Sequence, residues 1–117
     1  MSATENTADN PTLNSTLQAA LDAIAPCTVP FNLDPESGRE YITFNITDRP
    51  GDVGDDANGP RVAEVSVYFC CPLASDSLAK RAAIKEACDA ISDTLIRETD
   101  QSGSYGQIYL YTFQVVI

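Results

Sequence analysis

Side-chain oxygens that could bind a cation gather in the segment 48–60, DRPGDVGDDANGP. Its aspartates are Asp48, Asp52, Asp55 and Asp56. A calcium-binding EF-hand loop needs oxygen donors at alternating positions and a Glu at the twelfth. Counted from Asp48 the twelfth residue is Gly59, and counted from Asp52 it is Ala63, so neither register fits. We therefore predict no metal site, and favour either a solvated, self-repelling loop or a loop that presents negative charge to a partner or a channel.

Two other sets of residues could do chemistry, and neither has a supporting motif. Glu40 and Glu64 fall on neighbouring predicted strands and could approach each other as a carboxylate pair, but charges that alternate with apolar residues are typical of the solvent face of a sheet. The cysteines are Cys27, Cys70, Cys71 and Cys88. They contain no C-x-x-C pair, so we predict four small buried hydrophobic residues with reduced thiols.

The whole chain is acidic and lacks histidine. Its 117 residues include 7 Lys or Arg and 17 Asp or Glu, which gives a formal net charge of −10. This charge disfavours a grip on nucleic-acid phosphates or on anionic membranes. Without histidine there is no Ser–His or Cys–His pair, no histidine metal ligand and no proton shuttle at neutral pH. We expect no enzyme activity and no cofactor.

The length suits a single domain. The first ten residues, MSATENTADN, have neither the basic start nor the apolar run of a signal peptide. No segment reaches the ~20 apolar residues that span a bilayer. We expect a flexible arm at 1–11, one domain at 12–117, synthesis in the cytoplasm and no membrane partner.

Hydrophobic periodicity predicts the elements that position these residues. Leucines at helical spacing indicate a helix over 12–25, which Pro26 ends. Residues 26–39 contain three prolines and predict little regular structure. Strict alternation predicts a strand over 40–47, and a second strand follows the acidic loop at 61–71.

A further helix and further strands are predicted in the second half of the chain. It predicts a helix over 75–95, a short strand over 95–99, a turn-rich connection at 100–106 and a last strand over 107–117. Helices segregated on a mainly antiparallel sheet define an α+β two-layer domain, in the order α-β-β-α-(β)-β.

The last strand is apolar on both faces. Tyr109, Tyr111 and Phe113 share one face, and Ile108 and Leu110 share the other. A strand of this kind is central in its sheet or covered by a partner subunit. Core packing is the simplest interpretation of the three aromatic residues. Subunit contact is a close second, because tyrosines are common at protein interfaces.

Together these runs resemble the tail-completion or tail-terminator proteins of long-tailed bacteriophages. The resemblance lies in YITFN at 41–45, the acidic loop with Arg49-Pro50, AEVSVY at 63–68 and the long helix that follows. It covers residues 12–117 and rests on pattern and element order. Where family members often carry a glycine-aromatic turn after the second helix, this chain has LIRET at 95–99.

The resemblance implies a structural protein of the virion. Members of the family form a ring, typically a hexamer, that caps the head-proximal end of the tail tube, stops its polymerisation and meets the head–tail connector. The implied partners are further copies of the chain, the tail tube protein and a neck protein, while DNA passes through without specific binding. The residues expected to line the lumen or an interface are Asp48, Arg49, Asp52, Asp55, Asp56 and Arg61.

Two other functions stay open from the sequence. One is a different neck protein, a head-completion or stopper protein of similar size. The other is a small cytoplasmic acidic binding domain. Neither the number of subunits in a ring nor the surface that faces its lumen follows from the sequence.

Overall fold

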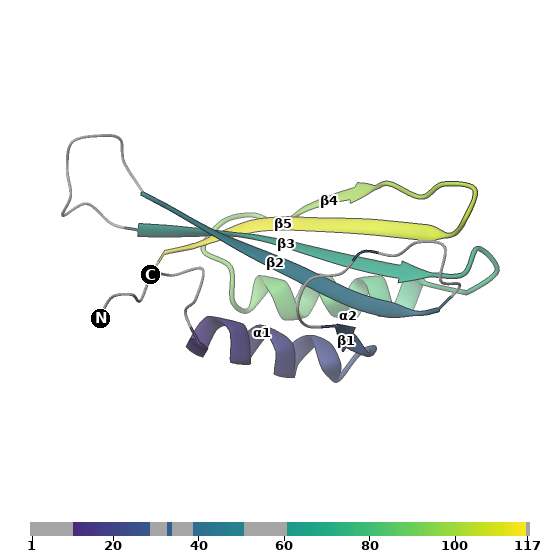
Figure 1. Ribbon diagram of the computed structural model, residues 1–117, viewed down its shortest axis with the longest axis horizontal. Helices are drawn as coiled ribbons and strands as arrows, with labels where there is room; N and C mark the ends of the chain where they lie inside the picture. Colours follow the sequence, from purple (N-terminus) through teal and green to yellow (C-terminus); the bar gives the residue numbers. More distant parts are fainter. Residues whose placement is uncertain (1–10, 29–32, 34–38, 51–60, 117) are drawn as a thin grey trace.

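The computed structural model describes residues 11–28, 33, 39–50 and 61–116. They form two helices and five strands in one two-layer domain (Figure 1), and the α+β fold expected from the sequence is confirmed. The elements are α1 (Pro11–Asp22), β1 (Cys27–Thr28), β2 (Tyr41–Pro50), β3 (Arg61–Cys71), α2 (Leu78–Asp89), β4 (Arg97–Asp100) and β5 (Gln107–Val116).

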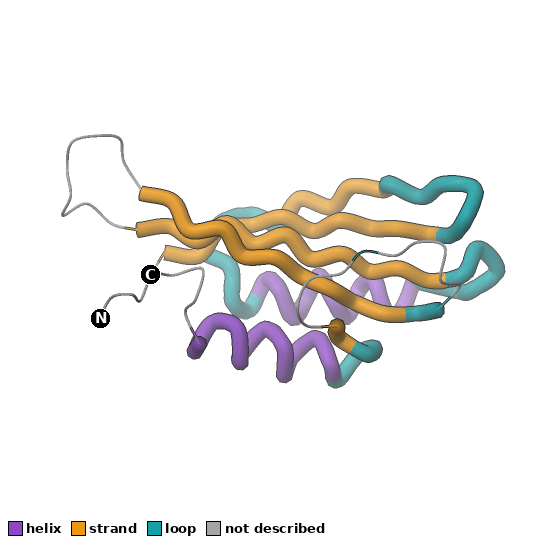
Figure 2. Tube along the Cα trace, viewed as in Figure 1, coloured by secondary structure: helices purple, strands orange, loops and turns teal. Residues whose placement is uncertain are grey.

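The five strands form one sheet in the order β1-β2-β3-β5-β4. The short β1 runs parallel to β2, and every other neighbouring pair is antiparallel. Pairing between β2 and β3 continues without a bulge from Tyr41–Cys70 to Pro50–Arg61. Both helices lie on the same side of the sheet (Figure 2), so no helix of the described residues covers its other face.

Several element boundaries differ from the sequence-based prediction. The first helix ends at Asp22 and not at residue 25, and the two-residue strand β1 lies in the segment 26–39, which was expected to have little regular structure. Residues 48–50, expected in the acidic loop, continue β2 because they pair with residues 61–63 at the start of β3. The second helix covers 78–89 and not 75–95, because the residues on both sides of it bond to β5 instead. The expected short strand is present as β4, shifted to 97–100.

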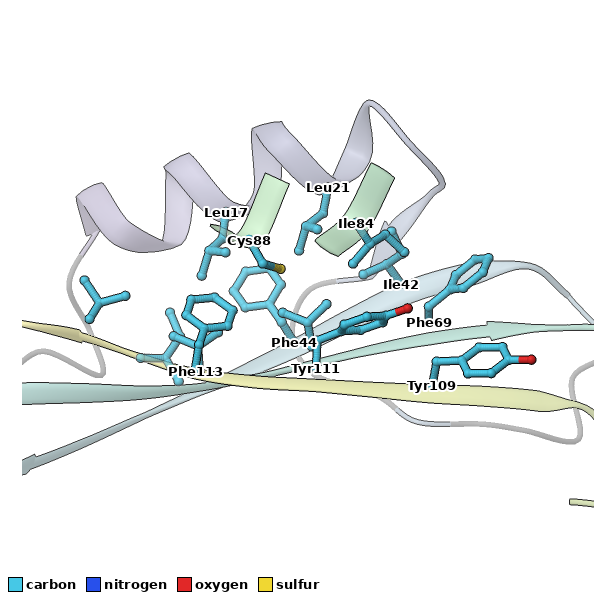
Figure 3. Packing of buried hydrophobic residues seen from close by; sticks show 14 of the residues in the cluster. Leu17, Leu21, Ile42, Phe44, Phe69, Ile84, Cys88, Tyr109, Tyr111 and Phe113 are labelled. Carbon is cyan, nitrogen blue, oxygen red and sulfur yellow. The ribbon is translucent and has the colours of Figure 1, made fainter. Parts of the chain in front are cut away.

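The core fills the space between the helices and one face of the sheet (Figure 3). Leucines spaced at 13, 17 and 21 put one stripe of α1 against the sheet, and Leu17 and Leu21 are fully buried. Helix α2 contributes Ile84 and Cys88. On the sheet side, every second residue of the three long strands points into this layer, which is the period expected of a half-covered sheet.

The cysteine prediction is confirmed for three of the four residues. Cys70, Cys71 and Cys88 are buried, Cys27 is half-buried, and all four are free thiols. Cys71 packs in the core cluster, whereas its neighbour Cys70 points to the opposite face, as alternation along a strand requires. Burial raises the pKa of Cys88 to about 12, and burial with the nearby Asp22 carboxylate raises that of Cys27 to about 11.

We expect all four thiols to react slowly in the folded protein. Because the thiolate is the reactive form, a thiol-specific reagent at about pH 8 should modify Cys27 about a hundredfold more slowly than a free cysteine, and Cys88 only after unfolding. The measurement compares labelling rates with and without denaturant. A burst of labelling at Cys88 in the native protein would contradict this packing.

Candidate functional site

The residues expected to line a lumen or an interface lie at the loop end of the β2–β3 hairpin. Asp48 and Arg49 are in β2, where they pair with Ala63 and Val62, and Arg61 begins β3. The hairpin therefore brings these three positions together at one end of the sheet (Figure 1). The other three expected positions, Asp52, Asp55 and Asp56, lie outside the described residues.

The three aromatic residues expected at a subunit contact lie elsewhere. Tyr109, Tyr111 and Phe113 point toward the helices (Figure 3) and are only 6%, 0% and 4% exposed. The structure thus replaces the subunit-contact expectation with the core interpretation, because side chains enclosed within one chain cannot reach a neighbour. The sequence could not decide between the two faces of β5, since both are apolar.

The carboxylate pair considered from the sequence does not form. Glu40 precedes Tyr41, which pairs with Cys70, whereas Glu64 pairs with Thr47 at the other end of the hairpin. Seven residues of extended strand place the two positions roughly 23 Å apart. Glu40 instead forms an ion pair with Lys80 of α2, and Glu64 accepts a hydrogen bond from Gln114.

A polar network that the sequence did not reveal fastens α2 and β4 to β5. Glu98 of β4 accepts hydrogen bonds from the Tyr111 hydroxyl at 2.6 Å and from Arg81 Nε at 3.3 Å. The guanidinium of Arg81 also lies over the ring of Tyr109, 4.0 Å from its centre. These contacts form a cation–π and ion-pair link between the helix and the sheet.

A second hub of the network is Gln107, the first residue of β5. Its amide nitrogen donates to the backbone carbonyls of Pro72 at 3.0 Å and Ser75 at 2.8 Å. Its carbonyl oxygen accepts from the hydroxyls of Ser77 and Tyr109 at 2.9 and 2.6 Å. One side chain therefore holds the turn before α2 against the sheet, so this network serves structure rather than chemistry.

The network makes the fold less stable at high pH. Burial, followed by the hydrogen bond to Glu98, raises the pKa of Tyr111 above its ordinary value of 10.0. The folded protein keeps the neutral phenol at a pH where the unfolded chain has lost the proton. The stabilisation is therefore complete below about pH 10 and is lost as the pH rises further.

We expect the free energy of unfolding of the wild type to fall more steeply above about pH 10 than that of Tyr111→Phe, which has no phenol to ionise. Urea unfolding at a series of pH values measures both slopes. The thiols contribute equally to both proteins, so equal slopes would show that Tyr111 does not titrate differently on folding.

The face of the sheet opposite the two helices is a second surface to consider. Its rows alternate between apolar and polar, with half-buried Tyr68 and Leu110 beside Ser66 and Thr112. A shallow hollow of about 300 Å³ opens where β4 leaves this face. Its polar lining residues are Glu64, Ser66, Thr94, Arg97, Thr112 and Gln114.

Exposed leucines flank the β4 side of the molecule. Leu95, just before β4, is 92% exposed, and Leu78 at the start of α2 is 69% exposed. Leu95 borders a second hollow with Ile96 and the outer side of α2, and Leu78 shares a third with Glu98. Single exposed leucines are common on protein surfaces, and it is a contiguous apolar patch that marks a contact with another protein.

The described residues contain neither a metal cluster nor a long apolar helix. Within them no three His, Cys, Asp or Glu side chains gather where they could hold a metal ion. Among the same residues, neither helix has the length and apolar character needed to span a membrane. Comparison of the chain with protein-family models and with curated proteins finds no match. The open sheet face and the β4 side are therefore the candidate functional surfaces.

Proposed function

We propose that this chain is a ring-forming tail terminator subunit, a structural protein at the head-proximal end of a phage tail tube. In this role the ring stops polymerisation of the tube and joins the tail to the head. Its partners are further copies of the chain, most simply five others, together with the tail tube protein and a neck protein. Its place is the virion, after synthesis in the host cytoplasm.

The observation that carries the proposal is the β2–β3 hairpin. The two runs that resemble the tail-terminator family, 41–45 and 63–68, lie on these two strands, and residues 43–45 of the first pair with residues 66–68 of the second. The acidic segment that completes the resemblance begins in β2 at Asp48. A likeness that rested on scattered residues would not be expected to collect on one continuous hairpin.

The surfaces of the fold support the same role. A ring of identical subunits needs two different contact surfaces on each subunit. The sheet has two different edges, one formed by the short β1 with the part of β2 beyond it and the other by β4, and exposed leucines accompany the second. The net charge of −10 suits a passage through which DNA slides, since repulsion prevents binding.

The experiment that tests the proposal has two parts. The mass of the purified protein in solution and class averages from electron microscopy should give a closed ring. In a phage that lacks the gene, tails should be overlong or unjoined. Heads that leak DNA beside tails of normal length would point to a stopper protein, and a monomer that never enters virions would overturn the proposal.

A further inference from the structure

One part of the sheet edge, along residues 114–116 of β5, is closed by the chain itself. Where β4 no longer pairs with β5, residues 93 and 94 cover the edge of β5. The Asp93 carboxylate accepts a hydrogen bond from the N–H of Val116, and Thr94 Oγ1 accepts one from the N–H of Gln114. The Gln114 carbonyl accepts a hydrogen bond from the N–H of Asp93. A strand edge blocked in this way cannot pair with another molecule.

The outer edge of β2 has no such protection among the described residues. Only Ile42 and Thr43 are paired, with β1. The N–H of Ile42 donates to the carbonyl of Pro26, so the backbone groups of Ile42 point outward. By alternation along the strand, those of Phe44 and Ile46 point outward too. The stretch 41–47 carries no charge, proline or bulge of the kind that guards natural edges.

The outer edge of β4 is open as well. All four of its residues are exposed. The N–H of Gln101 donates to the carbonyl of Ile108, so the odd-numbered residues face β5 and the backbone groups of Glu98 and Asp100 point outward. By the same alternation the unpaired part of the β2 edge comprises Phe44, Ile46, Asp48 and Pro50, of which the first two are uncharged and keep an N–H, and the β4 edge comprises Glu98 and Asp100. The exposed Leu95 lies beside the β4 edge.

We propose that β2 of one copy pairs with β4 of the next, so that the sheet continues from subunit to subunit. This deepens the proposed ring and rests on it. The strand directions fit: β3 opposes β2, β5 opposes β3 and β4 opposes β5, so β4 runs antiparallel to β2. A rotation about an axis along the strands keeps these directions and gives an antiparallel contact. Contacts between two different surfaces form a ring when the rotation from subunit to subunit closes, and the proposed ring requires such a rotation.

Amide hydrogen exchange tests the pairing without a substitution. In a monomer the N–H groups of Phe44 and Ile46 should exchange fast, while those of Asn45 and Thr47, which face β3, should be protected. In the assembled protein all four should be protected, and dilution should release only the first two. Rings in which Phe44 and Ile46 remain unprotected would overturn the edge pairing and leave the ring proposal standing.

Two edge variants test which surfaces meet. Asn45→Lys/Thr47→Lys places charge on the β2 edge, and Asp100→Pro removes an outward N–H from the β4 edge. Each variant should fold and associate at least tenfold more weakly than the wild type. The matched controls are Ser66→Lys/Gln114→Lys, which adds the same charges to the same sheet face on β3 and β5, and Asp100→Ala, which keeps the N–H. Both controls should assemble.

Mixing the two blocked variants gives the decisive result. If β2 meets β4, each variant keeps one good edge, so the mixture should form dimers that cannot grow. If β2 met β2 of its neighbour, Asp100→Pro alone would assemble and the mixture would gain nothing, which would overturn the proposal. Mixed dimers of a protein that never enters virions would support the edge pairing and overturn the tail role.

Discussion

Tyr111→Asp is expected to prevent folding rather than to disperse rings of folded subunits. Tyr111 is fully buried between the helices and β5, and its hydroxyl bonds to Glu98. Loss of a buried aromatic side chain costs about 3–5 kcal/mol. Because the introduced carboxylate would also be cut off from water, the total approaches the 5–15 kcal/mol that stabilise an ordinary domain, in order of magnitude.

The matched control is Tyr105→Asp. Tyr105 is 63% exposed in the turn before β5, so the same change there should alter the free energy of unfolding by no more than about 0.5 kcal/mol. Circular dichroism and urea unfolding measure both variants. A Tyr111→Asp protein with a native melting curve and a lower mass in solution would show that Tyr111 lies at a subunit interface and not in the core.

Gln107→Leu is expected to lower the free energy of unfolding by about 2–4 kcal/mol, since each buried polar group left unsatisfied costs about 1–3 kcal/mol. The change removes the partner of the Ser77 and Tyr109 hydroxyls and the side-chain donor to the Ser75 carbonyl, whereas the Pro72 carbonyl keeps the backbone N–H of Ser75. Ser77 and Tyr109 are themselves buried, so water cannot replace the lost partner.

Gln101→Leu is the matched control for Gln107→Leu. Gln101 lies in the exposed turn between β4 and β5 and uses its backbone N–H, not its side chain, to bond Ile108. Urea unfolding should show a change within about 0.5 kcal/mol for Gln101→Leu. If both leucine variants were equally stable, the hub assigned to Gln107 would be disproved.

The elements were predictable because their periodicity reflects one covered face. Alternation identified both long hairpin strands, and the leucine spacing identified α1, since each of these elements has a polar side and an apolar side. β5 shows the limit of this reasoning. With apolar residues on both sides, its pattern could not indicate which face the helices cover, and Tyr111 was therefore open to two interpretations.

Boundaries and sites depended on contacts distant in sequence. Residues 48–50 read as loop because they contain charge and proline, yet pairing with 61–63 extends β2 through them. The second helix stops at Asp89 because Asp93 and Thr94 cap the edge of β5, a role that no local pattern signals. The proposed edge pairing could not be inferred without the strand order, which places β2 and β4 near opposite edges of the sheet.

The order of the strands also sets how the chain must fold. β2 and β3 are neighbours in sequence, but Cys71 pairs with Gln107 and Val62 with Val116, so the central pair of the sheet closes a long loop that contains α2. Contacts of such separation slow folding, because their entropy is lost before their energy is gained. Until β5 arrives, β3 has an unpaired side and an incomplete apolar layer. Slow pairing of strands distant in sequence is the kind of step at which unpaired strand edges favour aggregation.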